Sequence, residues 1–352
     1  MPGTMKAAVL HGPHDLRLEN RPVPTPKPDE VLVAIRSAGV CGSDVHYWQA
    51  GRIGDFVVHS PMILGHECAG VVEDVGSSVT GLRPGDRVAL EPGVPCRRCA
   101  SCKAGRYNLC PDVRFMATPP VDGSFAEYVV HPADFSYKLP DHVSLDEGAL
   151  LEPLSVGIHA ARRAGLGLGS LVLITGAGPI GLTALLAART AGAADVFVSD
   201  VAPNRLEVAR RLGARAVLDV RKSDLAQEVL RLTEGQGVDA VIECSGAPAA
   251  QSAGLLTLKR GGVMVLVGLG SDEITLSAAA LASHELDVRG VFRYANTYPA
   301  AVSIVASASV NLNPLVTHHF PLDEVHQAME VAHSRAGGAI KVVVHPTSHD
   351  RP

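Results

Sequence analysis

The stretch from Leu171 to Asp200 constrains the fold of this chain most strongly. It opens with the apolar run 171–175, which does not alternate with polar residues and is therefore typical of a parallel strand buried on both faces. Three glycines follow in the order G-x-G-x-x-G: Gly176, Gly178 and Gly181. The next residues, 182–191, are rich in Ala and Leu, which favour a helix. A glycine-rich turn between a strand and a helix predicts the nucleotide-binding unit of a doubly wound α/β fold.

The chemistry of this turn points to a dinucleotide. Glycines let the backbone approach a pyrophosphate, and the start of the helix offers unpaired N–H groups to its oxygens. A second strand, 195–199, is followed by Asp200, about 20 residues beyond the glycines, where a carboxylate accepts ribose hydroxyls and repels a 2′-phosphate. NAD is therefore favoured over NADP. Arg205 is basic and could meet a phosphate, but beside Asp200 we interpret it as covering the adenine or as a solvated helix residue.

Length and composition limit the classes of protein to consider. A chain of 352 residues favours two domains. A net charge of −5 argues against a nucleic-acid partner and an anionic membrane surface. The apolar run 171–191 is too interrupted by glycines, Pro179 and Arg189 to predict a membrane span. Seven cysteines without a recognisable signal peptide indicate a reducing cytoplasm, where thiols bind metal.

A cluster of four cysteines predicts a metal site. The residues fall as C-x2-C-x2-C-x7-C in a loop rich in Pro and Gly: Cys96, Cys99, Cys102 and Cys110. Four thiolates in one loop leave no position for water, as in a closed structural zinc site. An iron–sulfur cluster is the competing interpretation, because it also uses four cysteines. The metal would fold a loop that has little core of its own.

A second group of metal-binding residues is dispersed along the chain. Cys41 lies in GVCGSDVHYW, His66 and Glu67 follow a later apolar run, and Glu152 precedes a proline. One thiolate, one imidazole and carboxylates make an open zinc site of the catalytic type. Spacing alone does not separate this set from ordinary core residues. We interpret the remaining candidates as packing or surface residues: Cys68, Cys244, His59, His318 and His319.

The rest of the chain supports two domains. After Asp200, strands are expected at 216–220, 240–243, 263–268 and 288–292, which completes a six-stranded doubly wound sheet. Helical segments such as 224–233 and 249–258 are expected between them. Residues 5–40 read as short strands broken by turns, and residues 31–37 alternate as in a half-exposed antiparallel strand. The tail, with helices around 298–308 and 322–332 and a strand at 340–345, is expected to return to the first domain.

Several long motifs together resemble the zinc-dependent medium-chain dehydrogenases. GHECAGVVEDVG, the four-cysteine loop, LLEPLSVGIHA and GAGPIG occur in the order of that family. GVFRYANTYP and PLVTHHFPL are close to its polyol dehydrogenase branch, which includes the sorbitol, xylitol and arabinitol dehydrogenases. The resemblance implies a mainly-β GroES-like catalytic domain from residues 1–154 and 296–352, a Rossmann domain from 155–295, and a homotetramer.

The family also implies roles for individual residues. The catalytic zinc would be held by Cys41, His66 and Glu67, with Glu152 either a ligand or a partner of the zinc-bound water. Ser43 and His46 would serve proton relay and positioning. The substrate and nicotinamide pocket would be shaped by Tyr47, Phe115, Thr118, Arg293 and Tyr294. The residues expected to bind the cofactor are Gly176, Gly178, Pro179, Ile180, Gly181, Asp200, Arg205, Val267, Gly268, Leu269, Phe292 and Arg293.

The reaction implied is reversible oxidation of a secondary hydroxyl of a sugar alcohol to a ketose, with NAD as acceptor and two zinc ions per subunit. Zinc would stabilise the alkoxide of the substrate. A butanediol- or threonine-type zinc dehydrogenase is an alternative with the same cofactors. A non-catalytic NAD(H)-binding redox sensor is a second alternative, and the cysteine and histidine sets disfavour a zinc-free quinone reductase.

Overall fold

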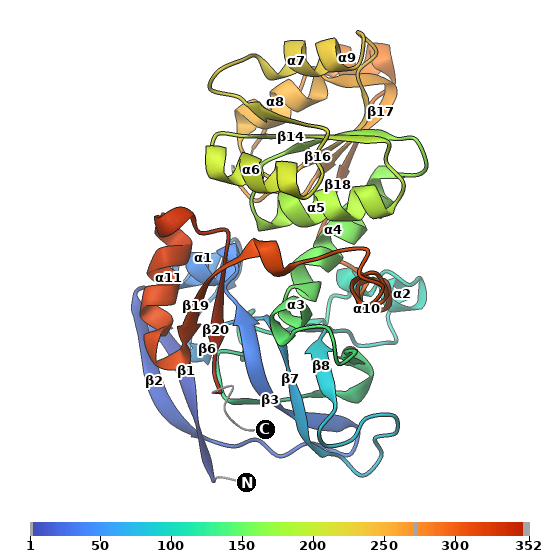
Figure 1. The fold of residues 1–352 in the computed structure, drawn as a ribbon. Coiled ribbons are helices and arrows are strands. Elements are labelled where there is room, and N and C mark those ends of the chain that lie inside the picture. Colours follow the sequence, from blue (N-terminus) through green and yellow to red (C-terminus); the bar gives the residue numbers. More distant parts are fainter. Residues whose placement is uncertain (1–2, 271–272, 348–352) are drawn as a thin grey trace. The chain divides into compact units, whose positions relative to one another are not determined.

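The computed structural model describes residues 3–270 and 273–347, and it divides into two compact units (Figure 1). The terminal unit comprises residues 1–152 and 298–352, and the central unit comprises residues 153–297. The junctions implied by the family resemblance are 154/155 and 295/296. The chain thus leaves the terminal unit once and returns to it.

The central unit is built on a six-stranded parallel sheet. The order across it is β15 (Ala216–Asp219), β14 (Asp195–Asp200), β13 (Leu171–Thr175), β16 (Val238–Glu243), β17 (Leu258–Leu266) and β18 (Asp287–Gly290). The crossovers include α5 (Pro179–Thr190), α6 (Pro203–Arg211), α7 (Leu225–Leu232), α8 (Pro248–Leu255) and α9 (Ala278–His284). This order confirms the doubly wound α/β fold. The chain reverses direction across the sheet between β13 and β16, where such folds bind ligands.

The apolar runs of the sequence become the core of this sheet. Leu173, Phe197, Val241 and Met264 pack in one buried cluster. The predicted helix 249–258 is wrong at its end, because β17 begins at Leu258 and pairs there with Val238. Helix α4 (Leu151–Ala164) precedes the sheet and crosses the boundary between the two units.

The terminal unit is mainly β. Its larger sheet runs β12 (Ser136–Lys138), β8 (Arg87–Leu90), β7 (Glu67–Val75), β3 (Glu30–Gly39), β20 (Lys341–His345) and β19 (Val316–Pro321), and β11 (Tyr128–Pro132) also pairs with β3. A smaller sheet contains β2 (Asp15–Pro22), β1 (Thr4–Gly12) and β6 (Met62–Ile63). Short pairs are β4 (Arg52–Ile53) with β5 (Phe56–Val57) and β9 (Gly93–Val94) with β10 (Arg114–Phe115).

The C-terminal segment belongs to this unit. Strand β20 pairs antiparallel with β3 and parallel with β19, so β20, drawn in red, lies beside β3, drawn in blue, in Figure 1. Helices of the unit are α1 (Gly42–Ala50), α2 (Ala100–Lys103), α3 (Leu145–Ala149), α10 (Tyr298–Ala306) and α11 (Val325–Ser334). The predicted helix 322–332 is a 3-10 turn at 322–324 followed by α11.

The prediction of a half-exposed strand at 31–37 is wrong. Val31, Val33 and Ile35 lie in the main core of the unit, and Leu32 and Ala34 on the other face are also buried. Helix α3 packs against β3, β7 and β8, which explains how the second face is covered.

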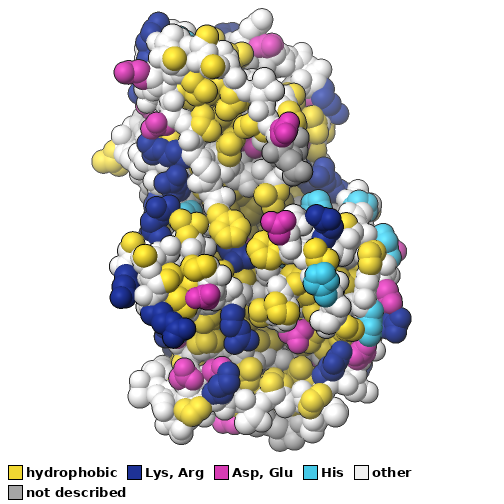
Figure 2. Space-filling view, turned by 180° about the vertical axis from the view of Figure 1, so that it is seen from behind, with side chains coloured by type: hydrophobic (Ala, Val, Ile, Leu, Met, Phe, Trp, Pro, Cys, Tyr) yellow, Lys and Arg dark blue, Asp and Glu magenta, His cyan; other side chains and the backbone are white. Residues whose placement is uncertain are grey.

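The surface and the helices of the described residues have two further features. Basic and acidic side chains are interspersed over the face shown in Figure 2 rather than gathered by sign. Within the described residues, no helix is both long and apolar enough to cross a membrane.

Candidate active site and metal centres

Cys41, His66 and Glu67 come together in the terminal unit. One ligand atom from each lies within 4.8 Å of the others. Cys41 precedes α1, and His66 and Glu67 lie where β7 begins, so one turn and one strand end supply the three groups. This set is the one predicted from the dispersed motifs, and its donor types are those of an open zinc site.

Asp44 ties these two segments together, and the sequence analysis did not identify it. Its side chain is fully buried and accepts hydrogen bonds from the N–H of Cys41 at 2.9 Å and of Gly65 at 3.0 Å. Its Oδ1 also lies 3.6 Å from His66 Nδ1. Burial opposes a proton on His66, but the charges of Asp44 and Cys41 outweigh burial and raise the pKa of the imidazole well above its ordinary value. The pocket therefore attracts positive charge, as a cation site must.

Lys341 is a second residue that the sequence analysis missed. Its Nζ donates hydrogen bonds to Glu67 Oε1 at 2.7 Å, to Oε2 at 2.6 Å and to the carbonyl of Val40 at 3.0 Å. Both side chains are buried, with 3% of Lys341 and 1% of Glu67 exposed. Burial opposes the charge of Lys341, but attraction to Glu67 and Cys41 outweighs it and raises the pKa of the ammonium. Each oxygen of Glu67 keeps a further lone pair for a metal.

Glu152 is buried at the start of α4. Burial is the main cause of the raised pKa of Cys68, and the charge of Glu152 adds to it; the same charge adds to the raised pKa of Lys341, so Glu152 lies near both groups. Among the described residues, it stands outside the group whose ligand atoms lie within 4.8 Å of one another. A carboxylate oxygen of Glu67, and not one of Glu152, thus lies within 4.8 Å of the ligand atoms of Cys41 and His66.

The other predicted residues of the terminal unit lie on two segments. Ser43, His46 and Tyr47 are on α1, with Tyr47 buried, Ser43 half-buried and His46 exposed. Phe115 is buried on β10, and its ring centroid lies 5.6 Å from that of His66. The N–H of Thr118 donates to the carbonyl of Phe115 at 3.1 Å, which places Thr118 in the following turn.

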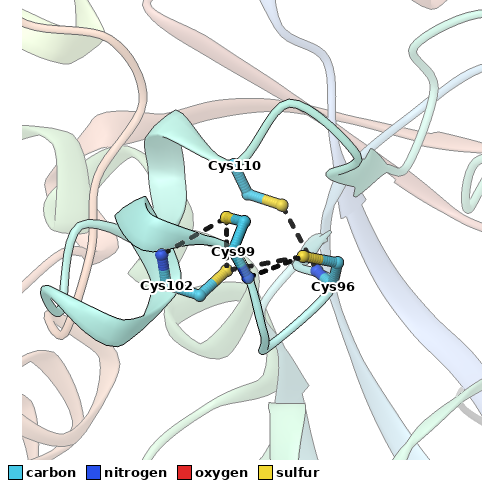
Figure 3. A group of neighbouring side chains, drawn as sticks. All are labelled: Cys96, Cys99, Cys102 and Cys110. Atoms are coloured by element: carbon cyan, nitrogen blue, oxygen red, sulfur yellow. Dashed lines mark hydrogen bonds between the residues drawn. The ribbon is translucent and has the colours of Figure 1, made fainter.

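The four-cysteine loop gathers its thiols (Figure 3). The Sγ of Cys102 lies 3.4 Å from that of Cys99 and 4.0 Å from that of Cys96, and one ligand atom from each of the four residues falls within 4.8 Å of the rest. Tetrahedral zinc with Zn–S bonds of about 2.3 Å separates its sulfurs by about 3.8 Å. The spacing of the thiols therefore fits one zinc ion.

The electrostatics of the loop also fit a cation. N–H groups of Arg98 and Cys99 lower the pKa of the Cys96 thiol to about 7. Burial and the neighbouring thiols raise the pKa of Cys102 to about 12, because a further thiolate needs a compensating positive charge. Helix α2 in this loop has no buried residue, so the loop has little core to hold it.

Glu91 fastens the loop to the body of the unit. Its buried carboxylate accepts hydrogen bonds from Tyr107 Oη at 2.6 Å, within the loop, and from Tyr137 Oη at 2.9 Å, on β12. Burial raises the pKa of Glu91, and the two phenols partly offset this effect. This anchor was not predicted from the sequence.

The glycine turn of the central unit has the shape of a phosphate cradle. A Cβ at Gly181 would lie 1.7 Å from the carbonyl oxygen of Gly176, so helix and strand pack too closely for any side chain. A Cβ at Gly178 would meet only Arg205 Nη1, at 3.8 Å. Since φ is −74° at Gly178, the backbone itself accepts alanine, and the open space there fits a bound pyrophosphate.

Asp200 and Arg205 lie beside this turn. Asp200 Oδ2 accepts the N–H of Ala177 at 2.6 Å, and Oδ1 accepts that of Ala202 at 2.8 Å. The Arg205 guanidinium lies beside Gly178, because its Nη1 would be 3.8 Å from a Cβ at that position. Pro179 and Ile180 form the first turn of α5.

Glu243 organises the neighbouring strand ends and was not predicted from the sequence. It is fully buried, and its Oε1 accepts hydrogen bonds from the N–H of Ser245 at 2.8 Å and from Thr175 Oγ1 at 3.2 Å. Its backbone carbonyl accepts the N–H groups of Val267 at 2.8 Å and Gly268 at 2.9 Å. The ends of β13, β16 and β17 are thereby joined.

The last predicted cofactor and pocket residues follow β17 and β18. Leu269 is exposed, and the Arg293 guanidinium lies over the Phe292 ring, 4.8 Å from its centroid. Arg293 has a φ of +53°, and Tyr294 is buried. All of them belong to the central unit.

Two family models match the chain. Residues 27–141 match the alcohol dehydrogenase GroES-like domain, and residues 179–307 match the zinc-binding dehydrogenase model.

Individual relatives match over nearly the full length. The sorbitol dehydrogenase of Bos taurus is 52% identical over 345 residues, which is 97% of this chain and 96% of the relative. The sorbitol dehydrogenase of Bacillus subtilis is 48% identical over 347 residues, 98% of each chain. A solved Escherichia coli structure, described as an oxidoreductase/dehydrogenase of unknown specificity, has a TM-score of 0.94 at 39% identity and covers 97% of this chain and 99% of its own.

Proposed function

This chain belongs to the zinc-dependent medium-chain dehydrogenase family, and we propose that it oxidises a secondary hydroxyl of a sugar alcohol to the ketone, reversibly, with NAD as acceptor. The gathering of Cys41, His66 and Glu67 within 4.8 Å is the observation that carries this proposal. The similarity to sorbitol dehydrogenases supports a polyol as the substrate.

We assign Cys41, His66 and Glu67 as the protein ligands of the catalytic zinc. When bound, zinc acts as a Lewis acid that makes an alcohol hydroxyl far more acidic. Asp44 accepts hydrogen bonds from the turn at Cys41 and from Gly65 beside His66, and Lys341 orients the Glu67 carboxylate through its hydrogen bonds. The buried Glu152 is assigned to the same pocket, as an outer partner of the water or hydroxyl there.

A route for the proton of the substrate is assigned along α1. Ser43 is half-buried two residues after Cys41, and His46 is exposed one turn further on, which supports this assignment. We assign the proton relay to them. Tyr47, Phe115 and Thr118 would bound the substrate, with the Phe115 ring beside His66 keeping water away.

The four cysteines of the loop 96–110 are assigned to a second, structural zinc. Their N–H···S bonds and spacing fit a closed tetrahedral site, and Glu91 holds the folded loop through Tyr107. The terminal unit is then the catalytic domain that holds both zinc ions.

The central unit is assigned to NAD. The N-terminus of α5 would bind the pyrophosphate, with the Arg205 guanidinium at the same turn. Asp200 would exchange its backbone contacts for the ribose hydroxyls and disfavour the 2′-phosphate of NADP. The remaining assigned residues, Val267, Gly268, Leu269, Phe292 and Arg293, would border the nicotinamide half.

Homotetramer assembly and a cytoplasmic location complete the proposal. Strand β18 ends the six-stranded sheet, and three of its four residues are exposed, which leaves an edge that a second copy could cover. All seven cysteines are free thiols, which agrees with a reducing compartment. Light scattering should give four times the mass of the chain.

The test is NADH formation by the zinc-loaded protein with sorbitol, xylitol, ribitol, arabinitol, galactitol, 2,3-butanediol and threonine, each repeated with NADP. A site built to pair several hydroxyls rejects substrates that lack them, so polyols with NAD should rank first. Preference for butanediol or threonine would refute the polyol assignment. Tight NADH binding without turnover of any alcohol would favour a redox sensor.

A further inference from the structure

We propose that the terminal unit holds a third metal site, in which His319, His345 and Asp146 bind a divalent transition metal such as Zn²⁺. The three residues come from β19, β20 and α3, and one ligand atom of each lies within 4.8 Å of the others. None of them belongs to the Cys41 cluster or the four-cysteine loop.

The distances fit a single ion. His319 Nδ1 lies 3.1 Å from His345 Nε2 and 3.5 Å from the Oδ2 of Asp146. Tetrahedral zinc with Zn–N and Zn–O bonds of about 2.0–2.2 Å separates its ligand atoms by about 3.3–3.6 Å. Small side-chain rotations therefore suffice to close the site.

Strand β3 orients two of the ligands. The carbonyl of Arg36 accepts the Nδ1–H of His345 at 2.8 Å, which fixes the tautomer and leaves the Nε2 lone pair facing His319. Ser37 Oγ donates to Asp146 Oδ1 at 2.6 Å, so Oδ2 is the oxygen turned to His319. Partners of this kind, on the far side of a histidine and a carboxylate, are what hold metal ligands in place.

Burial gives the site both rigidity and access. The side chains of His345 and Asp146 are 14% and 19% exposed, whereas His319 is 53% exposed. His319 and His345 also line a surface groove, from which an ion can enter. Three protein ligands leave a fourth position for water or another small ligand.

The ligand types define the class of metal. Two imidazoles and one carboxylate suit Zn²⁺, Co²⁺ or Ni²⁺, whereas Mg²⁺ and Ca²⁺ prefer oxygen alone and Cu⁺ prefers sulfur. Because the ligands lie on β19, β20 and α3, the ion would clamp the returning C-terminal segment to the rest of the unit. Metal binding should therefore raise thermal stability.

Metal content of the folded protein tests the site. After equilibration with Zn²⁺ and gel filtration, wild type should carry one more zinc per chain than His319→Ala or His345→Ala, by mass spectrometry of the metal. His318→Ala is the matched control, since His318 is adjacent, contacts Thr317 and lies outside the cluster. It should keep the wild-type content.

Cobalt separates the three sites spectroscopically. The proposed site has no sulfur ligand. In the cobalt-substituted protein, His319→Ala should therefore have weaker d–d absorption than wild type and unchanged thiolate-to-cobalt charge-transfer bands. His319 is the most exposed of the three ligands, so this variant folds even if His345→Ala does not. Equal metal content in wild type and His319→Ala, or an equal loss in His318→Ala, would overturn the proposal. Neither outcome depends on catalytic activity.

Discussion

Replacing Lys341 by methionine should strongly destabilise the metal-free protein. The substitution keeps an apolar stem of four heavy atoms but removes the ammonium that donates three hydrogen bonds of 2.6–3.0 Å to Glu67 and Val40. Glu67 is then left as a buried carboxylate with no compensating charge. Breaking a buried ion pair in this way costs about 3–5 kcal/mol. At roughly 2–4 °C per kcal/mol for a large domain, the melting temperature should fall by about 10 °C.

Zinc and a second substitution provide the controls. A zinc ion on Glu67 supplies the missing positive charge, so the loss in melting temperature should be smaller for the zinc-loaded protein than after chelation. Lys341→Met combined with Glu67→Gln removes both charges and should recover most of the stability. Differential scanning fluorimetry of wild type, Lys341→Met and the double variant, each with and without chelator, measures these differences. A fall below about 2 °C in the metal-free single variant, or no recovery in the double variant, would refute the reasoning.

The sign of the pH dependence follows from the same pair. The pKa of Lys341 is raised in the folded state, so the stabilisation is complete below its ordinary pKa and disappears only as the pH rises through the raised value. At neutral pH the wild type keeps the full contribution of the pair.

Three further changes test other parts of the account. Cys99→Ser should lower the melting temperature, because the loop depends on its zinc, and an unchanged value would argue against a structural metal. Gly178→Ala should weaken NADH binding about tenfold or more in a fluorescence titration, because the added Cβ fills the space for the phosphate. Stability should be unchanged, because this Cβ meets no atom nearer than 3.8 Å. A lost fold or unaltered affinity would contradict this. Burial lowers the pKa of His131 to about 4, below its unfolded value of about 6.5. As the pH falls from 6.5 to 4, His131 is protonated in the unfolded chain before it is in the folded protein, which should lower the free energy of unfolding by about 3 kcal/mol. Urea midpoints of wild type should drop more between pH 7 and 5 than those of His131→Asn, and parallel losses would count against it.

Features encoded in short stretches of sequence could be predicted. The six strands of the central sheet and its fold class are confirmed, because each strand is an apolar run bounded by turn residues. The four cysteines lie in one loop, so their spacing alone indicated that they would meet. The family, and with it the cofactors NAD and zinc, could also be recognised from long motifs. The individual site residues remain predictions until variants are measured.

Features that depend on distant partners could not be predicted. Lys341 and Glu67 are 274 positions apart, and only the pairing of β20 with β3 beside β7 brings them together. The exposure of residues 31–37 was misjudged because the pattern of one strand does not show that α3 will cover its second face. The interpretation of His319 as a surface residue is confirmed, since its side chain is 53% exposed, but the sequence did not show that His345 and Asp146, far away in the chain, lie beside it.

The central claim is that the Cys41 cluster oxidises the alcohol and the central unit binds the cofactor independently. The most direct measurement compares wild type with Cys41→Ser for zinc-dependent NADH formation from a polyol and for NADH affinity. The account predicts that turnover disappears in Cys41→Ser while NADH binds with unchanged affinity. Persistent turnover in Cys41→Ser, or loss of NADH binding in that variant, would contradict it.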